Sequence, residues 1–203
     1  RVHNVGFTGI DLIKKGRITS VSEIIKIYNL DLKRPIVLFT QHAVGVEYND
    51  SHYNIEQSLS ALYALADADV QIIITYPNND AGNVDIIDAI NTWTSTRPHH
   101  NIQVHKSLGQ QNYYGILSLG LNPEVRIACV GNSSSGIKET PAFLCPTVNI
   151  GNRQSGRLRA DNVLDCGYET EQILHKIKIA MFDEKFRGVC QKTKNPYGVG
   201  DSA

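Results

Sequence analysis

The stretch VRIACVGNSSSGIKE, residues 125–139, joins an apolar run to a small polar turn and then to the start of a helix. An apolar run of this length predicts a buried strand. Gly131 and Gly136 permit close approach of the backbone in the turn. The stretch therefore predicts a strand, a turn and a helix, the repeating unit of an α/β domain.

The same alternation of strand and helix signals extends along the chain. Ser20 and Glu23 form a capping box that predicts a short helix after them. Short apolar runs predict further strands at 1–6, 36–39, 70–75, 102–104, 147–150 and 162–164. Apolar residues and helix-start signals predict further helices at 55–66, 83–94, 113–119, 135–143 and 173–181.

This alternation predicts an α/β domain with a doubly wound parallel sheet, right-handed crossovers and helices on both faces. Ligands of such sheets bind beyond the carboxyl ends of the strands. We expect residues 1–33 to be a boundary segment and residues 34–186 to form the domain. The tail at 187–203 contains glycines and a proline, so we expect it to be irregular.

Composition excludes several classes of protein. Lysine plus arginine and aspartate plus glutamate number 20 each, so no charge excess favours nucleic acid or a membrane surface as a partner. No apolar run approaches the roughly 18 residues that cross a bilayer. The four cysteines form no C-x-x-C pair and lack a histidine at metal-finger spacing. We therefore expect reduced thiols, no metal site and a cytoplasmic protein.

The turn at 131–136 is a candidate anion site. Backbone N–H groups at a helix start are unpaired and partly positive, and the hydroxyls of Ser133 and Ser134 can donate to phosphate oxygens. An ordinary helix cap is the alternative interpretation. The motif continues with Ile-Lys, unlike a Walker loop, which disfavours an NTPase. Glu139 lies one turn further on, where its carboxylate either accepts the two hydroxyls of a ribose or stabilises the helix dipole.

Polar residues also follow other predicted strands. A loop at 149–157 carries Arg153 and Arg157, whose guanidinium groups are forked, permanently charged donors suited to a diphosphate. His42 is a candidate phosphate ligand or proton-transfer group, or else a structural histidine. Asn78 either contacts a ligand or belongs to a turn. Because parallel strands bring these loops to one edge of the sheet, they predict a single anion site there.

Four motifs together resemble the hydrolysing UDP-N-acetylglucosamine (UDP-GlcNAc) 2-epimerases: TQH at 40–42, YPNNDAG at 76–82, GNSSSGIKE at 131–139 and GNRQSGR at 151–157. NPYG at 195–198 also resembles a segment of that family. The resemblance covers roughly residues 1–201. Ala43 is a departure, because relatives commonly have proline after the histidine.

The resemblance implies a Rossmann-like sheet that forms the C-terminal domain of a two-domain enzyme of the GT-B type. In such an enzyme the diphosphate is held by two serines and an arginine, the ribose by a glutamate, and the uracil by the backbone at 106–107. The UDP-binding residues implied here are Asn78, Ser107, Ser133, Ser134, Glu139 and Arg153. The catalytic residues implied are His42 and Arg153.

The implied reaction needs no cofactor and no metal. UDP is eliminated from UDP-GlcNAc to give 2-acetamidoglucal, and hydration then gives N-acetylmannosamine for sialic acid synthesis. The first alternative is the same reaction on UDP-N,N′-diacetylbacillosamine, for legionaminic acid synthesis. Further alternatives are a GT-B glycosyltransferase and a non-catalytic nucleotide-sensing module.

The resemblance also implies partners. Nothing in the sequence corresponds to the family's N-terminal domain, and Met181 is the only methionine. We therefore expect the chain to belong to a longer protein, to be inactive without that domain, and to be homo-oligomeric in its full-length form. UDP and a UDP-sugar are the expected ligands.

Overall fold

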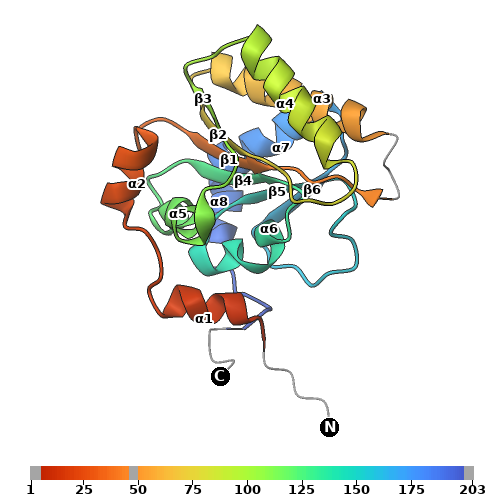
Figure 1. Cartoon of the computed structure of the whole chain (residues 1–203). Helices are drawn as coiled ribbons and strands as arrows, with labels where there is room; N and C mark the ends of the chain where they lie inside the picture. Colours follow the sequence, from red (N-terminus) through yellow and green to blue (C-terminus); the bar gives the residue numbers. More distant parts are fainter. Residues whose placement is uncertain (1–5, 46–49, 199–203) are drawn as a thin grey trace.

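The computed structural model describes residues 6–45 and 50–198, and within them six strands form one parallel sheet (Figure 1). Neighbouring strands pair in the order β3-β2-β1-β4-β5-β6. This is the order of a Rossmann fold, so the predicted doubly wound sheet is confirmed. The strands are β1 (Ile36–Thr40), β2 (Gln71–Thr75), β3 (Ile102–His105), β4 (Ile127–Gly131), β5 (Thr147–Ile150) and β6 (Val163–Cys166).

Helices cover both faces of the sheet (Figure 1). The side chains of Val37 and Phe39 pack into one apolar cluster, and those of Ile36 and Leu38 pack into the other. Burial on both faces explains why the strands are continuous apolar runs. The first cluster includes residues of α3 (Ser51–Asp67), α4 (Asn83–Thr96) and α7 (Thr170–Phe182). The second includes residues of α2 (Val21–Tyr28) and α5 (Gly109–Leu117).

The capping box predicted at the start of α2 is present. The hydroxyl of Ser20 accepts the backbone N–H of Glu23, and the Glu23 carboxylate accepts the backbone N–H of Ser20 at 3.1 Å. Two otherwise unpaired donors are thereby satisfied, which fixes where the helix begins.

Two helices were not predicted from the sequence. The first, α1 (Thr8–Lys14), lies within the boundary segment 1–33, and its residue Ile10 is buried. The second, α8 (Glu184–Cys190), includes residues 187–190 of the tail expected to be irregular, whereas residues 191–198 lie in no helix or strand. In α8, Arg187 is buried and donates to the backbone carbonyl of Pro123. The prediction for the tail was therefore wrong only for 187–190, where α8 is stabilised by a contact with a residue distant in the sequence.

The helix predicted at 135–143 is split into α6 (Ser135–Lys138) and the 3₁₀ helix η3 (Thr140–Phe143). Pro141 has no N–H and cannot continue an α-helical ladder, so the hydrogen-bond pattern changes at this point. A second 3₁₀ helix, η2 (Ser118–Leu121), follows α5. The strand predicted at 1–6 lies outside the described residues except for Gly6. Of the described helices, none is long and apolar enough to cross a membrane.

Gly131 ends β4 where this strand lies against β1. Its φ is +126°, and a Cβ atom at this position would lie 1.9 Å from the carbonyl oxygen of Thr40. The next N–H group, of Asn132, donates to the same carbonyl at 3.2 Å. Glycine is therefore required for the chain to leave β4 so close to β1.

We predict that Gly131→Ala lowers the free energy of unfolding by about 3 kcal/mol or more, because alanine is strained at this φ and its Cβ would displace Thr40. Gly188→Ala is the control. Gly188 lies in α8 with nothing within 4 Å of an added Cβ, so alanine should stabilise the chain by about 0.5–1 kcal/mol. Urea unfolding followed by circular dichroism measures both changes. Equal stability of the two variants would contradict the close approach of β4 to β1.

Candidate functional site

The strand order changes direction between β1 and β4, at the centre of the carboxyl edge of the sheet. Thr40 and Gly131, the last residues of these two strands, are partners in the sheet register. The crossovers that follow β1 and β4 run to opposite sides of this point. Such a switch point is where α/β sheets bind ligands.

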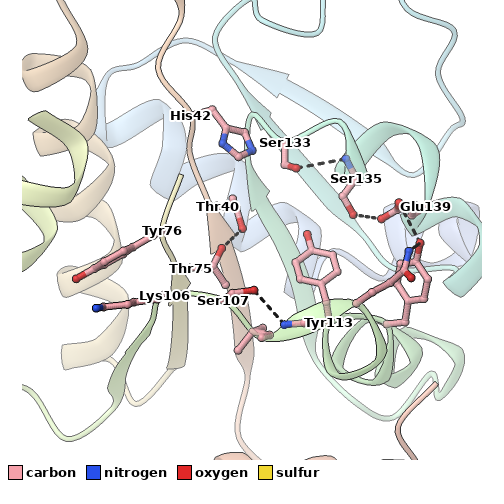
Figure 2. Close-up of a pocket in the computed structure, with 14 residues that line it drawn as sticks. Thr40, His42, Thr75, Tyr76, Lys106, Ser107, Tyr113, Ser133, Ser135 and Glu139 are labelled. Atoms are coloured by element: carbon pink, nitrogen blue, oxygen red, sulfur yellow. Dashed lines mark hydrogen bonds between the residues drawn. The ribbon is translucent and has the colours of Figure 1, made fainter. Parts of the chain in front are cut away.

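A cavity of about 290 Å³ opens at this edge (Figure 2). Residues that follow β1, β2, β3 and β4 contribute to its wall, together with two tyrosines of α5. Polar side chains predominate among them, so the wall offers many hydrogen-bond partners to a ligand. The lining residues are Thr40, His42, Thr75, Tyr76, Lys106, Ser107, Leu108, Gly109, Gln110, Tyr113, Tyr114, Ser133, Ser135 and Glu139.

Asn132 is completely buried and joins three loops. Its side-chain oxygen accepts the backbone N–H of His42 at 2.7 Å, and its side-chain nitrogen donates to the backbone carbonyl of His42 at 2.9 Å. Its own backbone carbonyl accepts Nη1 of Arg153 at 3.3 Å and Nε2 of Gln154 at 2.7 Å. The loops after β1, β4 and β5 are therefore fixed to one another by this residue.

His42 is a neutral hydrogen-bond donor at the wall of the cavity. Its Nδ1 accepts the backbone N–H of Asn78 at 2.9 Å, so the neutral ring carries its proton on Nε2. Burial, and next the positive charge of Arg153, lower the pKa of His42 to about 4. The imidazole is therefore uncharged at neutral pH.

Arg153 lies beside the cavity and is paired with a carboxylate. Its Nη2 lies 3.3 Å from Oδ2 of Asp80, and Asp80 also accepts the side-chain N–H of Asn78 at 2.7 Å. The hydrogen bond from Asn78, and then that from Arg153, lower the pKa of Asp80. The guanidinium group is therefore held in place, with its charge partly balanced before any ligand arrives.

The turn at 131–136, called the serine turn below, has hydrogen bonds that differ from those of a simple helix cap. The hydroxyl of Ser133 accepts the backbone N–H of Ser135 at 3.4 Å, and the hydroxyl of Ser135 donates to the carboxylate of Glu139. Ser134 is the N-cap residue of α6 but makes no side-chain capping bond. Because α6 has only four residues, individual N–H and O–H groups contribute more here than a helix dipole.

The structure places the sequence-predicted residues in two groups. His42, Ser107, Ser133 and Glu139 border the cavity, as does Lys106. Three further described residues stand outside its lining, namely Asn78, Ser134 and Arg153. Asn78 bonds to His42, and Arg153 bonds to Asn132 next to the serine turn. The loop that carries Arg153 therefore lies at the same edge of the sheet as the serines.

Several residues that organise the site are not among those predicted from the sequence. Asn132 and Gln154 are fully buried polar side chains. The position of Asn132, directly after a buried strand, is a feature of the sequence that could have identified it. A buried amide in that place must find partners on neighbouring loops. Tyr114 had no such feature, because it lies among apolar residues of a predicted helix.

The described part of the chain holds no group of three or more His, Cys, Asp or Glu that could bind a metal ion. Its four cysteines are free. Burial raises the pKa of Cys129 to about 12, so this residue remains a thiol inside the apolar core.

Comparisons with known proteins agree on one family. The family model described as UDP-N-acetylglucosamine 2-epimerase matches residues 1–203. The GDP/UDP-N,N′-diacetylbacillosamine 2-epimerase (hydrolyzing) of Campylobacter jejuni is 28% identical over 185 residues, 91% of this chain and 46% of the relative. The UDP-N,N′-diacetylbacillosamine 2-epimerase (hydrolyzing) of Legionella pneumophila is 29% identical over 202 residues, 100% of this chain and 49% of the relative.

Solved structures share the fold. The crystal structure of UDP-GlcNAc 2-epimerase from Neisseria meningitidis bound to UDP-GlcNAc superposes with a TM-score of 0.71 at 17% identity, covering 98% of this chain and 52% of that one. The chain therefore spans about half the length of the proteins it matches.

We predict that the His42 imidazole titrates near pH 4 when its ring protons are followed by NMR. Arg153→Gln removes a positive charge and should raise the pKa of His42 towards its ordinary value of about 6.5. Arg157→Gln, an exposed position in the same loop, is the matched control and should leave the titration unchanged. A pKa near 6.5 in the unmodified chain would show that the ring is neither buried nor influenced by Arg153.

Proposed function

The chain belongs to the UDP-N-acetylglucosamine 2-epimerase family, and we propose that it is the UDP-binding half of a hydrolysing enzyme that converts UDP-GlcNAc into N-acetylmannosamine and UDP. Elimination of UDP gives 2-acetamidoglucal, and hydration completes the reaction, which supplies sialic acid synthesis. The observation that carries the proposal is the polar cavity at the switch point, bordered by His42, Ser133 and Glu139.

The proposed role of these residues is to stabilise the diphosphate as it leaves the sugar. Negative charge on the diphosphate grows while the C1–O bond breaks, and fixed donors at that position lower the barrier. His42 supplies a neutral N–H group, Ser133 a hydroxyl, and Arg153 a permanent charge. The two hydrogen bonds between the Asn132 side chain and the His42 backbone support this role, because a preorganised donor needs little rearrangement.

We assign roles to the remaining predicted residues from their positions in and near the cavity. In the proposed complex, Glu139 accepts the ribose hydroxyls, the backbone near Ser107 contacts the uracil, and Ser134 and Asn78 lie near the phosphates. Lys106 and Ser107 border the same cavity as Glu139, which supports one continuous nucleoside site.

We assign the residues that handle the proton at C2 to a separate N-terminal domain. The chain spans 46% and 49% of two of its relatives, which supports this division. In this arrangement residues 34–186 are the UDP-binding domain, with residues 1–33 and 187–203 leading to the other domain. The chain by itself should have no turnover, because a site with one wall missing neither excludes water nor aligns an acid and a base.

A second candidate substrate is UDP-N,N′-diacetylbacillosamine. The Campylobacter jejuni and Legionella pneumophila relatives carry this substrate in their names and match nearly all of the chain. The residues proposed here contact the nucleotide, which is common to both substrates. In this proposal these residues therefore do not distinguish the two sugars.

Arg153→Ala should weaken UDP binding by about 1.5–3 kcal/mol, the range for a charge-assisted hydrogen bond. Arg157→Ala in the same loop is the control and should bind UDP normally, and Ser134→Ala should lose less than Arg153→Ala because backbone donors remain. Isothermal calorimetry with the chain and UDP measures all of these affinities. Undiminished UDP affinity in Arg153→Ala would remove this residue from the site.

The reaction itself is tested with a longer protein that contains this chain. Incubation with UDP-GlcNAc should release UDP and N-acetylmannosamine, detected by NMR, and a parallel incubation with UDP-N,N′-diacetylbacillosamine identifies the preferred sugar. The chain of residues 1–203 should release neither product under the same conditions. Transfer of the sugar to an acceptor, without free N-acetylated sugar, would instead identify a glycosyltransferase.

A further inference from the structure

The carboxylate of Glu139 is held by two hydroxyl groups of the chain itself. Tyr114 donates to Oε1 at 3.1 Å, and Ser135 donates to Oε2. Figure 2 shows the hydrogen bond between Ser135 and Glu139 at the side of the cavity, and Tyr114 also borders this cavity. Each carboxylate oxygen has about two acceptor positions, so each retains one for a ligand in the cavity.

Tyr114 is a rigid donor. Its side chain is only 1% exposed, and its ring lies 5.7 Å from the ring of Phe143, measured between centroids. Nε2 of Gln110 donates to the phenol oxygen at 3.2 Å, which leaves the phenol hydrogen directed at Glu139. Burial, and next the negative charge of Glu139, raise the pKa of Tyr114, so the group keeps its proton at neutral pH.

Packing alone does not require this hydroxyl. The ring of Tyr114 belongs to the apolar cluster beneath the sheet, where phenylalanine would fill the same space. A hydroxyl placed inside such a cluster is costly unless it is paired. Its pairing with a carboxylate that borders the cavity therefore indicates a role at the site.

We propose that Tyr114 is a positioning residue that, together with Ser135, fixes the Glu139 carboxylate so that its two free acceptor positions match the adjacent hydroxyls of a ribose. The inference rests on the proposed function, in which Glu139 binds the ribose of UDP. It assigns to Tyr114 the selectivity of the site for a ribonucleotide over a nucleotide whose sugar lacks hydroxyls. Although Tyr114 borders the cavity, it acts through Glu139 in this proposal, because its hydroxyl donates to the carboxylate.

The test compares two ligands that share the base and the diphosphate. Calorimetry measures the affinity of the chain for UDP and for 2′,3′-dideoxyuridine 5′-diphosphate. The unmodified chain should prefer UDP by roughly 10- to 100-fold, as expected for hydrogen bonds to a charged acceptor. Tyr114→Phe should reduce this preference by about 3- to 10-fold, because the carboxylate must now be immobilised when the ligand binds. The affinity for the dideoxy ligand should stay unchanged.

Two further variants make the result specific. Tyr63→Phe removes a tyrosine hydroxyl that donates to the backbone carbonyl of Trp93 at 3.0 Å, away from the cavity lining, and should leave the preference intact. Ser135→Ala removes the other donor to Glu139 and should also lower the preference. It provides the same test if circular dichroism shows that Tyr114→Phe does not fold.

The outcomes separate this inference from the proposed function. Equal weakening of both ligands by Tyr114→Phe, or an unchanged preference, would overturn the positioning role. If the unmodified chain binds both ligands equally, or if Glu139→Gln keeps the full preference, the ribose assignment of Glu139 is itself wrong. A preference that is lost in Glu139→Gln but kept in Tyr114→Phe refutes only the role of Tyr114.

Discussion

The side-chain amide of Asn132 makes the contact on which the site depends. It is enclosed between the ends of β1 and β4, where an unpaired amide would cost free energy. The oxygen and the nitrogen of this amide both pair with the backbone of His42. The backbone carbonyl of Asn132 accepts hydrogen bonds from Arg153 and Gln154 in the loop after β5. This geometry requires that β4 end in contact with β1, which the absence of a side chain at Gly131 allows. The need to pair the buried amide of Asn132 therefore determines how the loops at the carboxyl edge are arranged.

This arrangement of the loops determines the charge states of the side chains at the carboxyl edge. The half-buried His42, held near Arg153, stays neutral at neutral pH, so it contributes a donor without adding charge. Arg153 is paired with Asp80, which keeps its guanidinium group oriented while partly balancing it. The chain as a whole has no net charge at pH 7. In the proposed complex, attraction for the diphosphate therefore comes from local, fixed donors and has a short range.

Elements buried on both faces could be predicted from the sequence, and elements stabilised by distant contacts could not. The runs at 36–39 and 70–75 are apolar throughout because β1 and β2 have helices on both sides. By contrast, α1 packs near the end of the chain, with the N–H of Phe7 donating to the carbonyl of Tyr197 at 2.8 Å, and no local pattern encodes that contact. At the site, parallel topology predicts which loops meet. Which serine faces the cavity depends on backbone angles within the turn, so the sequence named Ser134 where the structure brings Ser135 to the wall.

We propose that a nucleoside diphosphate binds at the carboxyl edge of the sheet, between β1 and β4. The most direct measurement is a titration of the isotopically labelled chain with UDP, followed by the backbone amide signals in two-dimensional NMR. We expect saturable shifts concentrated at residues 40–42, 76–80, 106–110, 131–139 and 151–154. Saturable shifts confined to the apolar groove lined by Ile10, Pro141 and Thr193, or no shifts at all, would contradict the claim.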